Sequence, residues 1–243
     1  MTGLRLSYLV PVYNEELTIP DTTKVLVERL AEFSNSEVVL IENGSTDASP
    51  ALVEDLARTL SGPHVRVVAA HSDKGVGNAL RTGMQLASGD LWAITAADLP
   101  FGFSDLDQVL SMDPRPALVI GSKAHPQSRI GASAKRRLMS SVFRQARELM
   151  LGLGVGDTQG TVFIDGALGR RIVHHLQATD YFVTTELIAF ATRFGVEPIE
   201  VPVDYQAPRS GSKVRPVRDG TSMALALFDL RRRLARDAAG QIV

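Results

Sequence analysis

The stretch RLSYLVPV, from Arg5 to Val12, is apolar and rich in residues that favour β-structure, and it runs directly into the polar residues YNEE at positions 13–16. It therefore predicts a buried strand followed by a turn, with Pro11, Tyr13 and Glu15 close to the carboxyl end of the strand. The apolar spacing of the residues that follow is helical. A strand that leads straight into a helix indicates a βα unit, which is the repeating element of α/β folds.

Further strands and helices continue this alternation along the first half of the chain. The later strands are predicted at Glu37–Glu42, Val65–Ala70, Leu91–Thr95 and Ala117–Gly121, and the helices at Glu15–Phe33, Ala48–Leu60 and Val76–Ala87. Such alternation implies a parallel sheet with right-handed crossovers. The first half is therefore Rossmann-like, and ligands of such sheets bind beyond the carboxyl ends of the strands.

The second half has a different pattern. It contains, in order, a long basic helix at Ser133–Leu151, a glycine-rich turn at Gly152–Gly156, a strand at Thr161–Ile164, helices at Leu168–Leu176 and Thr184–Phe194, and a strand at Glu197–Tyr205. The segment Met112–Pro116 is better explained as a loop than as a linker between domains. We therefore expect one α/β domain over residues 1–243, with a mostly parallel central sheet flanked by helices.

Length and composition suit one domain with a sizeable core, because 44% of the 243 residues are apolar and 22% are charged. The 26 Lys and Arg nearly cancel the 27 Asp and Glu, so no overall field attracts nucleic acid and any anion site must be local. The absence of cysteine excludes a disulfide framework and a thiolate metal site. No signal-peptide pattern is visible, and no apolar run approaches the roughly 20 residues that cross a bilayer. We expect a cytoplasmic protein.

Polar side chains also follow the second predicted strand. Glu42 and Asn43 can hydrogen-bond a ribose diol or a base, and Gly44 lets the chain turn before the next helix. Ser45, Thr46 or Asp47 is expected to cap that helix. Two interpretations remain open at this point: residues 43–47 contribute to a nucleotide site, or they form a capped turn and nothing more.

Three blocks in this half carry a resemblance to a known family, and they are VPVYNEE at Val10–Glu16, IENGSTD at Ile41–Asp47 and DKGVGNALRTG at Asp73–Gly83. Together they resemble the donor half of an inverting family 2 glycosyltransferase, which has the GT-A fold. The resemblance implies a donor half at about residues 1–121 and an acceptor half at about residues 122–243. It implies that a nucleotide sugar, a UDP-hexose by preference, is bound by Pro11, Tyr13, Glu15, Glu42, Asn43, Lys74 and Asp98.

The block after the third strand also has the start of a dinucleotide fingerprint, but Leu80 stands where the third glycine would be. In the glycosyltransferase interpretation Lys74 lies near the diphosphate, and Gly75 and Gly77 allow close approach of the backbone at the start of a helix. The alternative is a solvated lysine before an ordinary helix.

The metal motif of the family is incomplete. Family members usually carry two aspartates that flank one residue after the fourth strand, whereas here the first is Ala96 and the second is Asp98. The resemblance implies a divalent cation, Mg²⁺ or Mn²⁺, at Asp98, bound more weakly than by a pair of carboxylates. Two alternatives remain: cations such as Lys74 do part of the neutralising, or the chain binds a nucleotide sugar without catalysing transfer.

Further motifs in the second half narrow the resemblance to polyprenyl-phosphate glycosyltransferases, and most of all to dolichyl-phosphate β-glucosyltransferases. These are GSKAH at Gly121–His125, the basic pair Arg136 and Arg137, DTQG at Asp157–Gly160, TTEL at Thr184–Leu187, EVPV at Glu200–Val203 and SGSKVRP at Ser210–Pro216. Departures are Lys123 in place of the usual arginine, Gly160 after Gln159, and the absence of an aromatic residue and an aspartate before Glu186. The resemblance implies an acceptor site formed by Lys123, Arg136, Ser140, Glu186 and Lys213.

The chemistry expected of such an enzyme is modest. A lipid phosphate with a second pKa of about 6 is largely dianionic at neutral pH and can attack the sugar without a general base. Catalysis then depends on positioning and on charge stabilisation, for which the resemblance implies Asp98, Lys123, Arg136 and Asp157. Asp157 and Glu186 can equally serve to fix loops through hydrogen bonds. If the acceptor is instead a hydroxyl of a small molecule or a glycan, Asp157 is the candidate base.

The C-terminal stretch from Arg209 to Arg236 surrounds an apolar run, Met223–Leu230, with Arg and Lys. A basic amphipathic helix of this kind can lie on an anionic membrane surface, which for a cytoplasmic protein is the inner face. The alternative is a terminal helix that packs its apolar face on the domain. Both interpretations remain open.

Overall fold

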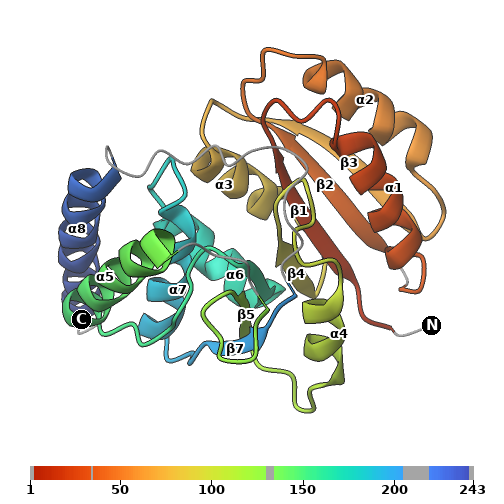
Figure 1. Cartoon of the computed structure of the whole chain (residues 1–243). Helices are drawn as coiled ribbons and strands as arrows, with labels where there is room; N and C mark the ends of the chain where they lie inside the picture. The colour runs from red at the N-terminus through yellow and green to blue at the C-terminus, as the bar shows by residue number, and fades with distance from the viewer. Residues whose placement is uncertain (1–2, 34, 130–133, 205–218, 241–243) are drawn as a thin grey trace.

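The computed structural model describes residues 3–33, 35–129, 134–204 and 219–240, apart from the side chains of residues 134–142, 219–223 and 237–240. A seven-stranded sheet runs through the described part in the order β3-β2-β1-β4-β6-β5-β7 (Figure 1). The strands are β1 (Leu6–Val12), β2 (Ser36–Glu42), β3 (Val65–His71), β4 (Leu91–Ile94), β5 (Leu118–Ser122), β6 (Thr161–Asp165) and β7 (Ile199–Pro202).

Most of the sheet is parallel. β1 pairs in parallel with β2 and β4, β2 pairs with β3, and β5 pairs with β7. β6 is the exception, because it runs antiparallel between β4 and β5. The predicted α/β class with a mostly parallel sheet is therefore confirmed. The antiparallel direction of β6 departs from the parallel sheet that the alternation of strands and helices implied. β3 and β7 form the two edges.

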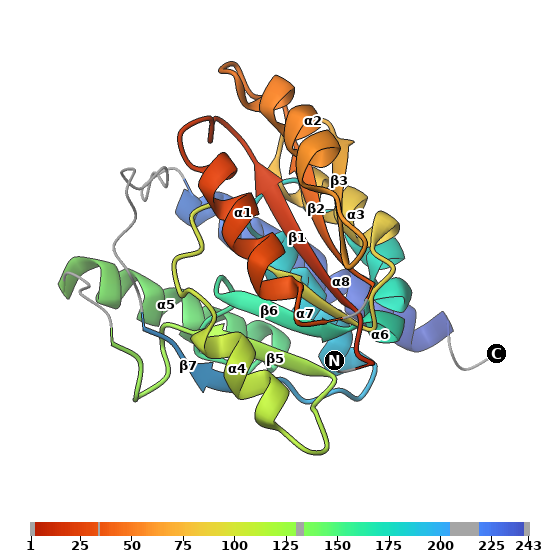
Figure 2. The same ribbon diagram turned by 90° about the vertical axis from the view of Figure 1, so that its right-hand side faces the viewer.

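Helices cover both faces of this sheet, with α1 and α4 in front of it and α8 behind it in the view of Figure 2. They are α1 (Ile19–Leu30), α2 (Ser49–Leu60), α3 (Val76–Leu86), α4 (Ser104–Ser111), α5 (Ala134–Leu151), α6 (Gly166–Ile172), α7 (Val183–Arg193) and α8 (Asp219–Gly240), with a short 3₁₀ turn at Val173–His175. The helix predicted from Glu15 begins only at Ile19, because Asn14 has a φ of +53° and residues 15–18 form a turn. α4 was not predicted.

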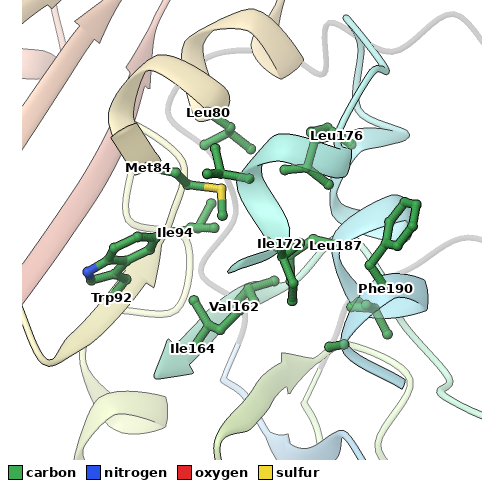
Figure 3. Close-up of a cluster of buried hydrophobic side chains, with 14 of the residues drawn as sticks. Leu80, Met84, Trp92, Ile94, Val162, Ile164, Ile172, Leu176, Leu187 and Phe190 are labelled. Atoms are coloured by element: carbon green, nitrogen blue, oxygen red, sulfur yellow. The ribbon is translucent and has the colours of Figure 1, made fainter. Parts of the chain in front are cut away.

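Side chains alternate between two apolar layers along β1. Tyr8 and Val10 pack with α1, α2 and α4 on one face, whereas Leu9 packs with α3, α6 and α7 on the other. Figure 3 shows the second layer, where Trp92 and Met84 lie beside residues of β6, α6 and α7. Helices therefore cover both faces of the sheet. Each of β1, β2 and β3 is followed by a helix, so the polar residues after these strands lie close to where the helices begin.

A buried carboxyl group lies under β5. Asp105, in the first turn of α4, is 2% exposed, and a Cβ added at Gly121 would lie 2.7 Å from its Oδ2. Burial raises the pKa of the Asp105 carboxyl to about 6. The folded protein therefore binds this proton more tightly than the unfolded chain, so the free energy of unfolding falls as pH rises from about 4 to about 6 and this contribution is constant above.

We expect Asp105→Asn to stabilise the protein at pH 8 by about 2 kcal/mol, because the amide needs no ionisation in a dry environment. The amide oxygen can still accept from the backbone N of Leu106, which lies 2.8 Å from Oδ1 of Asp105. Urea denaturation between pH 4 and pH 8 measures both the gain and the loss of the pH dependence in this window. Asp107→Asn, on an exposed side chain of the same helix, is the control and should keep the pH dependence.

Candidate functional site

The loops after β1 and β2 are joined into one unit. The backbone N of Asn14 donates to Oγ of Ser45 at 3.1 Å, and Oδ1 of Asn14 accepts from the backbone N of Thr46 at 2.8 Å. The backbone N of Glu15 donates to Oγ of Ser49 at 2.9 Å. The loops that contain residues 13–15 and 42–43, which the sequence predicts to bind one ligand, therefore form one hydrogen-bonded frame.

The same bonds show how the three residues predicted to cap α2 are used. Asp47 accepts from the first helical residue, with 3.0 Å between its Oδ1 and the backbone N of Ser49. The hydroxyl of Ser45 and the backbone N of Thr46 instead bond the loop after β1. The N-cap position is Ala48, which makes no side-chain capping bond, so none of the three residues proposed as caps occupies it. Of the three, Asp47 bonds the backbone of the first helical turn, and its other oxygen accepts from the backbone N of Glu16 at 3.2 Å.

Glu42 and Asn43 are buried at the end of β2, where they are 6% and 3% exposed. Burial alone would raise the pKa of Glu42, but hydrogen bonds from Ser45 and His71 outweigh it and hold the pKa below its usual value. His71 ends β3 directly beside Glu42, with 3.4 Å between its Nδ1 and Oε2 of Glu42. The hydrogen bond of His71 to Glu54 raises the pKa of the imidazole. Glu42 is thus held ionised, with His71 as a partner that the sequence does not predict.

Lys74 brings the loop after β3 to the loop after β1. Its Nζ donates to the hydroxyl of Tyr13 at 2.9 Å and lies 4.8 Å from the centre of the Tyr13 ring. Gly44 has a φ of +84°, and a Cβ added there would lie 3.3 Å from Cβ of Lys74. The exposed Lys74 is therefore held beside the residues that follow β1 and β2.

The two glycines after Lys74 contact the protein's own backbone. A Cβ added at Gly75 would lie 2.4 Å from the carbonyl oxygen of Thr179, and one added at Gly77 would lie 2.1 Å from that of Ala178. The backbone N of Gly77 donates to the carbonyl oxygen of Thr179 at 2.9 Å. The close approach that the glycines allow is therefore to residues 178–179, and the amide of Gly77 is already used.

Asp98 lies in the turn after β4. Ala96 is exposed and Asp98 is half-buried, and the turn is shaped by Leu99, which has a φ of +43°. Oγ1 of Thr22 donates to the carbonyl oxygen of Ala97 at 2.6 Å and ties the turn to α1. Among the described residues, no group of three or more His, Cys, Asp and Glu side chains could hold a metal ion. The donor set fits only a cation whose other ligands come from a bound phosphate group and water.

Lys123 and Asp157 meet after β5. Oδ2 of Asp157 accepts from the backbone N of Lys123 at 3.1 Å and lies 3.4 Å from its Nζ. Oδ1 of Asp157 accepts from the backbone N of Gln159 at 2.8 Å, and Nζ of Lys123 donates to the carbonyl oxygen of Gln159 at 3.0 Å. The same Nζ lies 5.6 Å from the centre of the Phe101 ring, which belongs to the loop that carries Asp98. Both Asp157 oxygens are thus engaged, and Lys123 borders the loop of the predicted metal site.

Two residues without a role predicted from the sequence hold this part in place. Both carboxylate oxygens of Glu200, on β7, accept backbone N–H groups, from Gly156 at 2.8 Å and from Asp157 at 3.1 Å. Arg147, on α5, is 1% exposed and donates to the carbonyl oxygen of Val155. Burial lowers the pKa of Arg147, which the charges of Asp157 and Glu200 oppose. The sequence feature that could have revealed Arg147 is the presence of an arginine on the apolar face of the predicted helix Ser133–Leu151.

The remaining predicted residues lie elsewhere. Glu186 is 1% exposed on α7, where Oε2 accepts from the backbone N of Gln177 and of Ala178, and Oε1 pairs with Arg233. Its bonds are those of a residue that fixes a loop, which is the second of the two roles that the sequence left open. Arg136 and Ser140 lie on α5, but their side chains are outside the described residues, and so are Lys213 and the motif at residues 210–216.

Comparison with known proteins connects this arrangement to one family. Residues 7–171 match the family described as glycosyl transferase family 2, which is more than half of the chain. Among curated relatives, the chain is 28% identical to glycosyltransferase AglD of Haloferax volcanii over 225 residues, 89% of this chain and 35% of that protein. It is 24% identical to the dolichyl-phosphate beta-glucosyltransferase of Dictyostelium discoideum, over 94% of this chain and 74% of that protein. The chain thus spans about a third of the first relative's length.

The solved structures that resemble the chain share its fold. One is the glucosyl-3-phosphoglycerate synthase of Mycobacterium tuberculosis in complex with Mn²⁺, UDP-glucose and phosphoglyceric acid. It superposes with a TM-score of 0.65 at 21% identity, over 96% of this chain and 80% of that chain. The mannosyl-3-phosphoglycerate synthase of Rubrobacter xylanophilus superposes with a TM-score of 0.65 at 19% identity, over 98% and 76% of the two chains. These matches confirm the predicted fold class.

Proposed function

Because the chain belongs to glycosyl transferase family 2, we propose that it transfers a hexose, by preference glucose, with inversion from a UDP-sugar to a polyprenyl phosphate. Relatives named dolichyl-phosphate beta-glucosyltransferase support this acceptor, and so does a relative from Pseudomonas fluorescens, 26% identical, that is named for transfer to undecaprenyl phosphate. Solved structures of the same fold contain UDP and UDP-glucose, which supports the donor.

In this proposal, the frame after β1 and β2 binds the nucleoside. The ionised Glu42 can accept hydrogen bonds from ribose hydroxyls or from the N–H of uracil, and the amide of Asn43 can both donate and accept. Pro11, Tyr13 and Glu15 complete this part. Lys74, fixed against Tyr13, supplies positive charge for the diphosphate.

A divalent cation, Mg²⁺ or Mn²⁺, belongs to the same proposal. When bound it would neutralise charge on the leaving diphosphate. Asp98 would hold it with a single carboxylate, because Ala96 cannot bind a metal. The diphosphate oxygens and water would complete its ligands, so that the cation and the nucleotide bind together.

The engagement of Asp157 favours a phosphate acceptor over a hydroxyl acceptor, and this observation carries the proposal. A hydroxyl acceptor needs a base, but the Asp157 carboxylate already positions this loop: Oδ2 holds the backbone N and the ammonium group of Lys123, and Oδ1 holds the backbone N of Gln159. A dianionic phosphate needs no base and requires cations that position it. Lys123 is such a cation, and we include Arg136, Ser140 and Lys213 in the same role.

We also propose that α8 contacts an anionic membrane surface. Leu225 and Phe228 are 72% and 55% exposed on one side of the helix, and the guanidinium of Arg232 lies 5.9 Å from the centre of the Phe228 ring. Leu227 and Leu230 are buried on the other side, so the helix both packs on the domain and presents apolar and basic groups outward. Of the helices in the described ranges, none is long and apolar enough to cross a membrane.

Calorimetric titration with UDP-glucose and GDP-mannose tests the donor site. We expect UDP-glucose to bind in the presence of Mn²⁺, and Glu42→Ala to weaken binding at least ~30-fold through loss of a buried hydrogen-bonding carboxylate. Glu54→Ala is the matched control, because Glu54 is an exposed carboxylate bonded to the same His71. If neither UDP-glucose nor GDP-mannose bound, the transferase proposal would be wrong, and the site would take a different ligand.

Transfer assays then test the acceptor. Polyprenyl phosphate and a panel of sugar and small-molecule hydroxyl acceptors are compared with the radiolabelled donor. We expect transfer to the polyprenyl phosphate, and we expect Asp157→Asn to retain a measurable rate because no base is required. Transfer to hydroxyl acceptors alone, abolished by Asp157→Asn, would show that Asp157 is a base and that the acceptor proposal is wrong.

A further inference from the structure

Glu186 holds the loop at residues 177–178, which lies far in sequence from the predicted donor residues. It stands in the first turn of α7, and its Oε2 accepts from the backbone N of Gln177 and of Ala178, at 2.8 Å in each case. The side chain is 1% exposed, so these bonds form away from water. A buried carboxylate that loses its partners is costly, which makes the conformation of residues 177–178 depend on Glu186.

The clamped loop in turn holds the start of α3. The carbonyl oxygen of Thr179 accepts from the backbone N of Gly77 at 2.9 Å, and that of Ala178 accepts from Nη1 of Arg81 at 2.6 Å. The absence of a side chain at Gly77 permits this contact. Because α3 begins at Val76, two residues after Lys74, the position of this loop sets the position of the lysine proposed to face the diphosphate.

Arg233 connects the C-terminal helix to the same carboxylate. Its guanidinium pairs with Oε1 of Glu186, donates to the carbonyl oxygen of His175 at 3.1 Å, and bonds Asp229 on its own helix at 3.1 Å. The side chain of Arg233 is 14% exposed. Figure 1 shows α8 running beside α5 and near α7, at the side of the molecule away from β1–β3. A continuous set of bonds therefore runs from α8 through α7 to the beginning of α3.

We propose that Arg233 and Glu186 are positioning residues for the donor loop at residues 74–77. They act through the backbone of residues 177–179 and do not contact the nucleotide themselves. The C-terminal helix is then part of the donor site's support, and loosening it weakens nucleotide binding. The inference rests on the proposed function for the identity of the ligand, although the coupling of α8 to α3 stands on the contacts alone.

Arg233→Gln tests this coupling against Arg232→Gln as the matched control, since Arg232 is the adjacent arginine and stacks on the exposed Phe228. UDP titrated with Mn²⁺ is expected to bind at least ~10-fold more weakly to Arg233→Gln and equally well to Arg232→Gln. Hydrogen exchange in Arg233→Gln is expected to become faster in residues 76–81 and 177–179 while exchange in α1 and α2 is unchanged. Equal losses of affinity in both variants, or exchange that accelerates evenly along the chain, would overturn the proposal.

Arg233→Lys provides the rescue, and it also serves if Arg233→Gln does not fold. A lysine keeps the charge beside Glu186 but cannot make all three contacts, so its affinity for UDP and its exchange pattern are expected to lie between those of the wild type and the glutamine variant. Arg233→Lys with the exchange pattern and affinity of the wild type would overturn the role of the three-way contact. If the wild type itself does not bind UDP, the proposed function fails, whereas the exchange pattern still decides whether α8 positions α3.

Discussion

Asp98→Ala is expected to lower kcat/KM for sugar transfer by ~10²–10³-fold and to abolish the dependence of the rate on divalent cations. In the proposed metal site Asp98 is the one carboxylate, because Ala96 stands where the resemblance implies a second aspartate, so its removal would take away the protein's share of that site. Steady-state rates with UDP-glucose, at several concentrations of Mn²⁺ and with EDTA, measure both effects. Asp55→Ala, on an exposed side chain of α2, is the control and should leave the rate unchanged.

The reciprocal change sharpens this prediction. Ala96 is exposed, so Ala96→Asp restores a second carboxylate without filling the core, and we expect it to tighten binding of Mn²⁺ with UDP about tenfold. In the absence of nucleotide, Mn²⁺ should bind the wild type too weakly to detect by electron paramagnetic resonance. Tight binding of Mn²⁺ to the nucleotide-free wild type would show that the protein alone completes the metal site, contrary to the donor set described above.

Gly77→Ala is expected to destabilise the protein by about 3 kcal/mol and to remove donor binding. The new methyl group would lie 2.1 Å from the carbonyl oxygen of Ala178, a backbone atom, so either α3 or residues 178–179 must move. For a chain of this size, such a loss lowers the melting temperature by roughly 6–12 °C. Thermal unfolding followed by circular dichroism, together with UDP titration, measures the two consequences.

Gly62→Ala is the matched control for this variant. A Cβ added at Gly62 meets nothing within 4 Å, and the residue lies in the connection between α2 and β3. Its melting temperature should stay close to that of the wild type. If Gly77→Ala melted at the same temperature as Gly62→Ala and bound UDP normally, the contact between residues 178–179 and α3 would have no role in holding the donor loop.

The strands of the first half could be predicted because each is a short apolar run followed by polar residues, and this local pattern is sufficient in a parallel sheet. β6 was found by the same pattern, but its direction depends on the path of α5 and the following loop, which no local pattern reports. α4 escaped prediction because its eight residues bury few apolar side chains, and one buried residue is the polar Asp105.

The candidate site likewise contains residues that could be placed from local sequence and residues whose contacts depend on packing. Tyr13, Glu42 and Lys74 could be placed together because the carboxyl ends of parallel strands share one edge of a sheet. The partners of Glu186 could not be predicted, since its bonds join residues 177–178, α7 and α8, and such contacts arise only from packing. The role of Gly77 was misassigned for a related reason: the sequence shows that something approaches the glycine but does not say what.

The strand order has a consequence for how the protein behaves at high concentration. A sheet edge can recruit the edge of a second molecule and start aggregation unless short strands, prolines or charges prevent it. β7 has four residues and ends at Pro202, which has no N–H to donate, and β3 carries Arg66, whose guanidinium bonds Glu37 on the neighbouring strand at 2.6 Å. Both edges are therefore poor templates for a further strand, which favours a monodisperse protein in concentrated solution.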